Sequence, residues 1–227
     1  MDFIRQWKMV DLSKIKAVGI IGAGSIGSWT ALSLAKMGVE DITVWDFDTI
    51  EEHNGPNQMY KVEDDGRPKV EALFDIIKEF AGTEIHCECS KYDGTKKPLM
   101  ICGVDDIEVR RDIFEDYIDN KYGIDRYWDA RMGGEMATII SINPKSMTDS
   151  KRYKESLFTR EETHELPCGE RSVVYNNEWI GSFIANQVKS FAMKDDIFTH
   201  VDFSWKPYEF SGSTLAGEFM FTKRRGK

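Results

Sequence analysis

The sequence predicts an α/β protein in which a mostly parallel sheet is flanked by helices and is followed by a C-terminal helix and antiparallel strands. Through the first 143 residues, short β-rich runs alternate with longer amphipathic stretches, the pattern of βαβ units. A glycine-rich turn, GAGSIG at 22–27, separates the first such run from the first helical stretch. Together these features indicate a Rossmann-like fold.

The predicted elements follow in order along the chain. Residues 17–22 (AVGIIG) form an apolar run of strand length, residues 25–37 a helix that Gly38 ends, and residues 42–46 a second strand. Apolar residues recur at helical spacing from Val70 to Phe80, with Pro68 near the start, where its missing N–H costs little. Further strands are predicted at 84–89, 99–102, 127–130 and 137–142, and a helix at about 107–122.

Beyond Pro144 the pattern changes. Residues 145–165 are polar and predict a long loop or mobile insertion, whereas residues 178–192 are amphipathic and predict a helix packed on the sheet. Two strand-like runs, 197–205 and 215–222, are expected to pair as a hairpin. The chain is therefore predicted to be one domain over 1–227, with a nucleotide-binding core (1–143), a loop region (144–176) and a C-terminal helix and hairpin (177–227). Aromatic residues of the tail are expected to be core or dimer contacts, with a peptide-docking face as the alternative: Phe198, Phe203, Trp205, Tyr208, Phe210, Phe219 and Phe221.

Composition excludes several function classes. With 30 Lys and Arg against 39 Asp and Glu, the formal net charge is -9, which argues against a nucleic-acid partner because phosphate neutralisation needs a basic surface. No apolar run approaches the roughly 18 residues of a membrane span. The first ten residues do not have the pattern of a signal peptide. A cytoplasmic protein without a membrane partner is expected.

The four cysteines are too sparse for a disulfide scaffold, and none forms a Cys-x-x-Cys pair, so no structural zinc site is predicted. Cys87, Cys89 and Cys102 lie inside predicted strands and are expected to be core residues. The four histidines are scattered, and none is given a role.

The GAGSIG turn has the spacing of a nucleotide-binding fingerprint. Gly22 permits the tight turn, Gly24 lets the backbone approach a phosphate, and Gly27 lets helix and strand pack closely. Asp46 follows at about the offset expected of a ribose-binding acid. A purely structural glycine turn is the alternative. Taken alone, these features would indicate an NAD-dependent oxidoreductase.

The next segment, WDFDTIEEHNGPNQMYKVEDDGRPKVEAL, favours a different function. It resembles the segment typical of the ThiF/MoeB/HesA family, the relatives of ubiquitin-activating enzymes, in which an Asp-x-Asp precedes an Asn-x-x-Arg-Gln run and a Gly-x-x-Lys at a helix start. Later segments resemble the family in the same order: ICGVDDIEVRRDI, DARMGGEMATIISINP and CGERSVVYNNEWIGSFIANQVKSFA. Arg5-Gln6 also matches a family pair, so the resemblance covers roughly residues 3–192.

The resemblance implies an ATP- and Mg²⁺-dependent adenylyltransferase. Such enzymes let a carboxylate attack the α-phosphate of ATP, which gives an acyl-adenylate and pyrophosphate. The implied substrate is the C-terminus of a ubiquitin-like or sulfur-carrier protein, or of a peptide, and the implied assembly is a homodimer. The implied nucleotide site comprises Gly22, Gly24, Ser25, Ile26, Gly27, Asp46, Asp48, Asn54, Asn57, Gln58 and Lys69.

Four residues are implied to act in the chemistry. Lys69 would neutralise phosphate charge, Asp105 would bind Mg²⁺, and Arg5 would reach the site of the neighbouring subunit. Cys168 would either accept the activated acyl group as a thioester or be a bystander. The plainer alternatives are a surface lysine at 69 and a helix N-cap aspartate at 105.

One departure from the family pattern bears on catalysis. Asn57 stands where the family has a phosphate-binding arginine, and an amide cannot cancel charge. Arg5 of a partner subunit, or Arg67 or Arg131 of the same chain, are the candidates to compensate. A catalytically silent nucleotide-binding scaffold is therefore the main alternative function, ahead of the NAD-dependent oxidoreductase.

Overall fold

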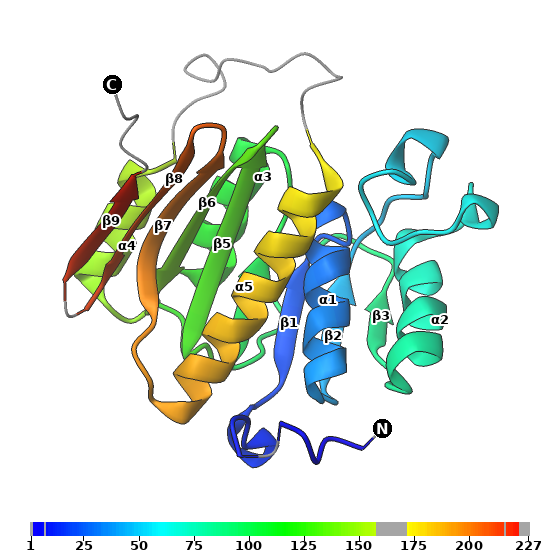
Figure 1. Cartoon of the computed structure of the whole chain (residues 1–227), viewed down its shortest axis with the longest axis horizontal. Helices are drawn as coiled ribbons and strands as arrows, with labels where there is room; N and C mark the ends of the chain where they lie inside the picture. The colour runs from blue at the N-terminus through cyan, green and yellow to red at the C-terminus, as the bar shows by residue number, and fades with distance from the viewer. Residues whose placement is uncertain (1, 7, 158–171, 216, 223–227) are drawn as a thin grey trace.

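The computed structural model describes residues 2–6, 8–157, 172–215 and 217–222 (Figure 1). Within this part of the chain, nine strands form one sheet in the order β3-β2-β1-β4-β5-β6-β7-β8-β9. The strands are β1 (Val18–Ile21), β2 (Ile42–Trp45), β3 (His86–Glu88), β4 (Leu99–Cys102), β5 (Arg126–Gly133), β6 (Met136–Ile142), β7 (Phe198–Trp205), β8 (Tyr208–Thr214) and β9 (Glu218–Thr222). The helices are α1 (Ser25–Met37), α2 (Lys69–Ala81), α3 (Ile107–Ile113), α4 (Met147–Glu155) and α5 (Val174–Met193).

The sheet has two halves that share β5. From β3 to β5 every neighbouring pair is parallel, and from β5 to β9 every pair is antiparallel. We call these the parallel half and the antiparallel half. The predicted α/β class, with a Rossmann-like sheet followed by a C-terminal helix and antiparallel strands, is confirmed. The subdivision of the chain at residues 143 and 176 stays a prediction.

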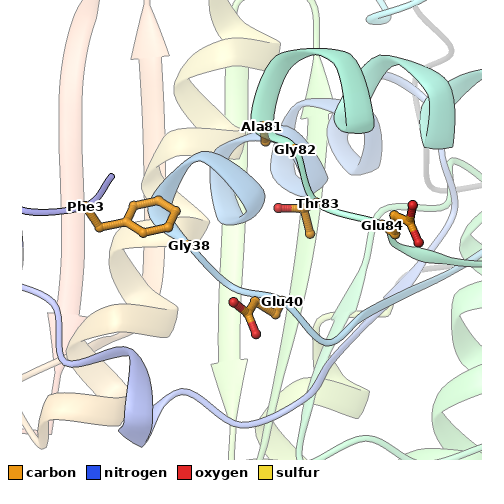
Figure 2. Close-up of a pocket in the computed structure, with 7 residues that line it drawn as sticks. All are labelled: Phe3, Gly38, Glu40, Ala81, Gly82, Thr83 and Glu84. Carbon is orange, nitrogen blue, oxygen red and sulfur yellow. The ribbon is translucent and has the colours of Figure 1, made fainter. Parts of the chain in front are cut away.

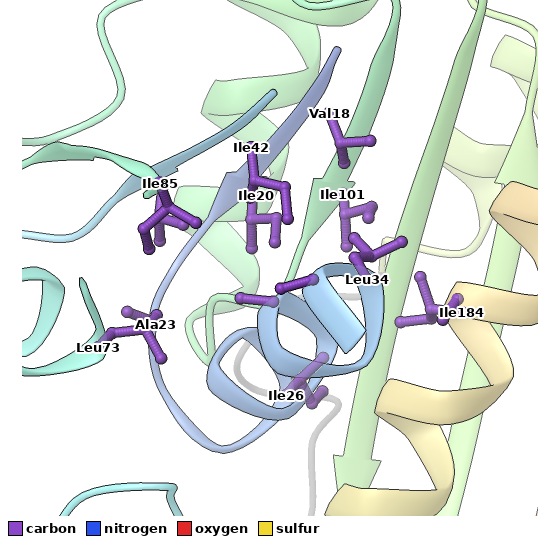
Figure 3. Close-up of a cluster of buried hydrophobic side chains, with 14 of the residues drawn as sticks. Val18, Ile20, Ala23, Ile26, Leu34, Ile42, Leu73, Ile85, Ile101 and Ile184 are labelled. Atoms are coloured by element: carbon purple, nitrogen blue, oxygen red, sulfur yellow. The ribbon is translucent and has the colours of Figure 1, made fainter. Parts of the chain in front are cut away.

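Two apolar clusters hold the helices on opposite faces of the sheet. On one face, α1, α2 and α5 pack on Val18 and Ile20 of β1 (Figure 3). On the other face, α3 and α4 cover Ile21 of the same strand, together with Met100 and Tyr127. Because successive side chains of a strand point to opposite faces, one short apolar strand serves both clusters.

Helix α5 lies very close to α1. A Cβ added at Gly181 would lie 2.8 Å from the carbonyl carbon of Trp29, so only glycine permits this approach. The two helices are adjacent in Figure 1, although about 150 residues separate them in the chain. This packing joins the C-terminal part of the chain to the first helix of the parallel half.

The predicted loop at 145–165 is wrong for its first part, because α4 forms there. Ser146 caps this helix by accepting a hydrogen bond from the Asp149 N–H at 3.2 Å. Tyr153 is fully buried, with its ring 4.3 Å from that of Phe114. The helix has only two apolar or aromatic residues, the exposed Met147 and the buried Tyr153, so the sequence offered little apolar periodicity.

The predicted C-terminal hairpin is also wrong. β7 pairs with β8, a strand that was not predicted, and β8 then pairs with β9. Strand β8 contributes few apolar side chains, and its main cross-strand pairs are Phe210 with Phe203 and Tyr208 with Trp205. Two predicted elements are shorter in the structure. The strand predicted at 84–89 extends only over β3, and the helix predicted at 107–122 is α-helical only as far as Ile113.

Candidate functional site

The glycine turn lies at the carboxyl end of β1, where α1 begins. Gly22 has φ +94°, a conformation that favours glycine. A Cβ added at Gly27 would lie 1.8 Å from the Gly22 carbonyl oxygen, whereas one added at Gly24 would meet nothing within 4 Å. The lack of a side chain at Gly27 thus lets the start of α1 pack against the Gly22 backbone, and the space beside Gly24 is open. Ser25 and Ile26 start the helix, and the N–H groups of a first turn have no partner within their own helix.

This turn lies at the switch point of the parallel half. Strand order reverses between β1 and β4, and open α/β sheets bind ligands outside the carboxyl ends of strands at such a point. The residue after β4 is bound to the end of β1, because the Gly103 N–H donates to the Ile21 carbonyl oxygen at 2.9 Å, and a Cβ added at Gly22 would lie 3.2 Å from the Gly103 carbonyl carbon. The loop that follows Gly103 carries Asp105. Its carboxylate is exposed, and the N-cap of α3 is its neighbour Asp106. The helix N-cap, the alternative role predicted for Asp105, is therefore filled by Asp106.

Asp46 connects the ends of β1 and β2. One of its carboxylate oxygens accepts from the Ala23 N–H at 2.6 Å, and the other accepts from the Asp48 N–H at 2.8 Å. Burial raises the pKa of this carboxyl, while the hydrogen bonds from Asp48 and Ala23 and the charge of Lys69 act in the opposite direction. Asp46 therefore organises the glycine turn itself, and its contact with a ribose stays a prediction.

Lys69 lies in the same region, at the start of α2. Its ammonium group is 2.9 Å from Asp48 Oδ2, and its backbone N–H donates to the Asp48 carbonyl oxygen at 2.9 Å. The side chain of Lys69 is 10% exposed and that of Asp48 50%. The alternative of an ordinary surface lysine is therefore wrong. A buried ammonium held on one half-exposed carboxylate can change partner when an anion with more charge arrives.

The segment 54–60 packs on the glycine turn. The Tyr60 hydroxyl donates to the Ala23 carbonyl oxygen at 2.6 Å, and burial raises its pKa well above the usual value, so it stays a donor. Asn54 is buried, and its Oδ1 accepts from the Glu51 N–H. Within the described part of the chain, Gln58 Oε1 is buried without a hydrogen-bond partner. We call residues 54–60 the covering segment.

Asn57 is fixed through its backbone. Its carbonyl oxygen accepts from Trp29 Nε1 at 3.3 Å and from Asn177 Nδ2 at 2.8 Å. Neither Tyr60 nor Asn177 was predicted from the sequence, because neither residue type at its position indicates a site residue. The sequence feature that could have indicated Asn177 is the pair of adjacent Asn residues in an otherwise amphipathic helix.

The two candidate compensating arginines of this chain are already bound to acidic residues. Arg67 is paired with Asp64 and Asp75, each at 2.7 Å. Arg131 is bound to Asp129 at 2.6 Å, and it also donates to the carbonyl and the hydroxyl of Ser156. Both guanidinium groups therefore already have partners.

Arg5 is exposed in a segment at the other end of α1. Gln6 Nε2 donates to the Met37 carbonyl oxygen at 2.6 Å, and Phe3 packs beside Gly38. The N-terminal segment that carries Arg5 thus lies at the C-terminal end of α1, whereas the glycine turn is at the start of that helix (Figure 1). The predicted contact of Arg5 with a neighbouring subunit stays a prediction. Cys168 lies outside the described residues, as does Arg171.

The cysteine prediction is partly wrong. Cys102 is buried, Cys87 is half-buried and Cys89, which follows β3, is exposed. The strand there is shorter than predicted, so Cys89 lies beyond its end. Burial raises the pKa of the Cys87 thiol to about 11, so that thiol is not a nucleophile at neutral pH. No group of three or more His, Cys, Asp or Glu able to hold a metal ion occurs among the described residues.

The aromatic residues of the tail are not fully buried. Phe203 stacks on Trp179 of α5 at 4.2 Å, and Trp205 meets Phe203 edge to face at 4.8 Å. Phe198 and Phe210 are half-buried and Tyr208 is exposed. The side chains of Phe219 and Phe221 lie outside the described part. The role of this cluster as a dimer contact or a docking face stays a prediction.

A shallow pocket of about 230 Å³ lies far from the glycine turn, between the C-terminal ends of α1 and α2 (Figure 2). Phe3, Glu40 and Glu84 line it together with glycines that end the helices. It faces the amino ends of the parallel strands and is not part of the candidate site. Among the described residues, no helix is long and apolar enough to cross a membrane.

Solved structures share this fold. The Escherichia coli protein MccB, crystallised with AMPCPP and MccA, superposes with a TM-score of 0.67 at 15% identity, over 96% of this chain and 69% of MccB. PaaA superposes with a TM-score of 0.67 at 17% identity, over 94% of this chain and 69% of PaaA. At these identities the likeness establishes the fold.

Sequence relatives match a shorter part of the chain. The ubiquitin-like modifier-activating enzyme ATG7 of Kluyveromyces lactis is 33% identical over 82 residues, which are 34% of this chain and 14% of ATG7. The uncharacterised protein y4oA of Sinorhizobium fredii is 34% identical over 76 residues, 13% of its length. The chain thus spans only a small part of either relative. The model of the ThiF family matches residues 1–120, more than half of the chain. With its glycine turn at the switch point and this match, the chain belongs to the ThiF family.

Proposed function

We propose that this protein binds Mg·ATP and adenylylates the C-terminal carboxylate of a ubiquitin-like protein, a sulfur-carrier protein or a peptide. In this reaction a carboxylate oxygen forms a bond to the α-phosphorus of ATP, the bond between that phosphorus and the bridging oxygen breaks, and pyrophosphate leaves. The products are an acyl-adenylate and pyrophosphate, so atoms and charge balance without a further reactant.

One observation carries the proposal: the carboxyl ends of three adjacent parallel strands bring together a glycine turn, a buried lysine and an exposed aspartate. The turn follows β1, the Asp48–Lys69 pair follows β2, and Asp105 follows β4. Phosphoryl chemistry chiefly requires positioning and cancellation of negative charge. Lys69 supplies charge at this edge, and the first-turn N–H groups of α1 supply donors.

The residues fit an ATP molecule with Mg²⁺. The open space beside Gly24 admits a phosphate against the backbone. Lys69, now held by Asp48, would move its charge to the phosphates. Asp105 offers an exposed carboxylate, the hard oxygen ligand that Mg²⁺ prefers. When bound, Mg²⁺ would neutralise phosphate charge.

The partner and assembly are inferred from family resemblance and relatives. MccB has been crystallised with MccA and with AMPCPP, and the Kluyveromyces lactis relative is named a ubiquitin-like modifier-activating enzyme. A homodimer in the cytoplasm follows from the family, with Arg5 completing the site of the neighbouring subunit in place of the charge that Asn57 lacks. Cys168 as a thioester-forming nucleophile belongs to the same proposal.

The test is ATP–pyrophosphate exchange with the full chain. Labelled pyrophosphate should enter ATP only when a carrier protein or peptide with a free C-terminal carboxylate is present, and a C-terminally amidated peptide is the matched control. Asp105→Ala should abolish exchange. Exchange that proceeds equally with the amidated peptide would contradict activation of a C-terminal carboxylate.

A catalytically silent nucleotide-binding scaffold is the second candidate. It is favoured by one observation: Asn57 lacks a charge, and the candidates Arg67 and Arg131 are already paired. In that case ATP would raise the melting temperature, but no carrier would give exchange. A rise with NAD and none with ATP would instead support the oxidoreductase.

A further inference from the structure

The first turn of α5 carries two adjacent asparagines, Asn176 and Asn177, that are completely buried. Neighbouring residues of a helix point about 100° apart, so the two amides face different parts of the molecule. A buried amide is costly unless its donors and acceptor are satisfied. The partners of these two side chains therefore indicate what they hold in place.

Asn177 holds the covering segment. Its Nδ2 donates to the Asn57 carbonyl oxygen at 2.8 Å and to Ser172 Oγ at 2.9 Å. Trp29, near the start of α1, donates to the same Asn57 carbonyl oxygen from the other helix. One backbone carbonyl thus receives hydrogen bonds from α1 and from α5, the two helices that pack most closely on this face.

The position of the Asn57 carbonyl bears on the glycine turn. Two residues farther on, the Met59 N–H donates to Ser28 Oγ at 3.4 Å, and then the Tyr60 hydroxyl donates to the Ala23 carbonyl oxygen at 2.6 Å. The covering segment therefore lies on the turn that is proposed to hold phosphates. A shift of its backbone at Asn57 would be transmitted over three residues to Ala23.

Asn176 holds the antiparallel half. Its Nδ2 donates to the carbonyl oxygens of Gly134, in the turn between β5 and β6, and of Met136, the first residue of β6, at 3.1 and 3.0 Å. Its Oδ1 accepts from Trp205 Nε1, at the end of β7, at 3.2 Å. Both donors and the acceptor of this amide are used, so the α5 turn is fixed to two antiparallel strand ends.

We infer that Asn177 is a positioning residue for the nucleotide site, and that Asn176 makes nucleotide affinity depend on the antiparallel half through the same helical turn. The inference rests on the proposed binding of ATP, but not on adenylylation. Neither asparagine touches the glycine turn; each acts through residues that it holds.

The first experiment measures the dissociation constant for Mg·ATP by calorimetry with the full chain. Asn177→Ala should raise it about fivefold, the worth of one net hydrogen bond. Trp29→Phe removes the other donor and should raise it by a similar factor. The double variant should exceed the product of the two, because the carbonyl then loses both donors.

Asn186→Ala, at an exposed position of the same helix, is the matched control and should leave the constant unchanged. Asn177→Asp keeps the shape of the side chain but places an acceptor against the Asn57 carbonyl, so its effect should exceed that of Asn177→Ala. If Asn177→Ala does not fold, Asn177→Asp and Trp29→Phe still test the positioning role. Independent, multiplicative effects of Trp29→Phe and the Asn177 variant on the dissociation constant would overturn the positioning role, because two donors that hold the same carbonyl must act on it together.

The second experiment tests the link to the antiparallel half. Trp205→Phe removes the N–H that Asn176 accepts and should raise the dissociation constant about twofold. The same substitution should have no further effect in an Asn176→Ala background. An unchanged constant in Trp205→Phe and Asn176→Ala would overturn the link. If the wild-type chain does not bind Mg·ATP, the proposed function itself is overturned. If it binds Mg·ATP but shows no ATP–pyrophosphate exchange, both experiments still test the inference, because both measure only the dissociation constant for Mg·ATP.

Discussion

The two halves of the sheet differ in how completely they are covered. All residues of β1, β2 and β4 are buried, whereas β7 has two buried residues, Thr199 and Val201, and β8 has one, Gly212. Parallel strands lie under helices on both faces and are almost continuously apolar, and antiparallel strands can leave a face to solvent. The three central strands of the parallel half therefore expose polar groups only beyond their ends, whereas the edge strand β3 is exposed at His86 and Glu88. The antiparallel half instead carries partly exposed side chains along its length.

The largest effect is expected from Gly27→Ala in the parallel half. Its Cβ would lie 1.8 Å from the Gly22 carbonyl oxygen, so the turn cannot form unchanged, and a loss of more than about 4 kcal/mol in the free energy of unfolding is expected. Urea-induced unfolding would measure this loss of stability. Gly24→Ala is the matched control: its φ of -74° suits alanine and its Cβ meets nothing. Stability should therefore be kept while ATP affinity falls. A normal ATP affinity in Gly24→Ala would contradict the phosphate role of this turn.

Arg110→Met should have the next largest effect, because it acts on β5, which both halves share. Arg110 and Asp129 form an ion pair whose side chains are 4% and 0% exposed, and Arg110 also donates to the carbonyl oxygens of Val104 and Ala130. Removing one partner of a buried pair costs about 3–5 kcal/mol, and because Asp129 keeps its pair with Arg131, a loss at the low end of this range is expected. Chemical unfolding should show this loss. Lys61→Met, which breaks the exposed pair with Glu79, should change stability little. A similar small change in both variants would show that the buried pair is not important for stability.

Lys69→Met, in the parallel half, should affect the rate of ATP–pyrophosphate exchange much more than the free energy of unfolding. The exchange rate should fall by about 10²–10³, because charge stabilisation of the transition state is lost. The free energy of unfolding should fall by less than about 1 kcal/mol, since the partner Asp48 is half-exposed. Lys78→Met, on the exposed face of α2, should change neither quantity. Unchanged exchange in Lys69→Met would remove Lys69 from the proposed chemistry.

The smallest effect is expected on the open face of the antiparallel half. Asp202 accepts hydrogen bonds from His200 at 2.8 Å and Thr138 at 2.7 Å, and the bond with His200 is the main cause that lowers its pKa. A lowered pKa stabilises the fold above the usual aspartate value, and this contribution is lost as pH falls through the lowered value. Asp202→Asn should cost less than about 1 kcal/mol at pH 7, because the carboxylate is 55% exposed. Thermal unfolding should show the difference shrinking below about pH 4. A constant difference would mean that the carboxylate charge is not involved.

Much of the parallel half follows from local sequence. The glycine spacing at 22–27, the apolar runs of β1, β2 and β4, and the amphipathic pattern of α2 each arise from neighbours in the chain. The predicted α1 boundaries, 25–37, are those of the structure. These patterns are readable because burial on a helix or strand repeats with a fixed period.

The antiparallel half was predicted less well because some of its segments lack this periodicity. β8 (YEFSGST) and α4 (MTDSKRYKE) are short, polar and partly exposed, so neither has a strong period. Their positions depend on partners elsewhere, such as Phe114 for Tyr153 and β7 for β8. Local propensity alone does not decide such segments.

The sequence by itself determined the fold class, the glycine turn and the residues Asp46, Lys69 and Asp105 that end or follow adjacent strands. Only the tertiary structure decided that Asp46 holds the Ala23 N–H, that Lys69 rests on Asp48, and that Arg67 and Arg131 are already paired. It also decided that Asn177 meets Asn57, 120 residues earlier in the chain. Periodicity records which side chains are buried, but a hydrogen bond between distant segments depends on where packing brings their backbones together.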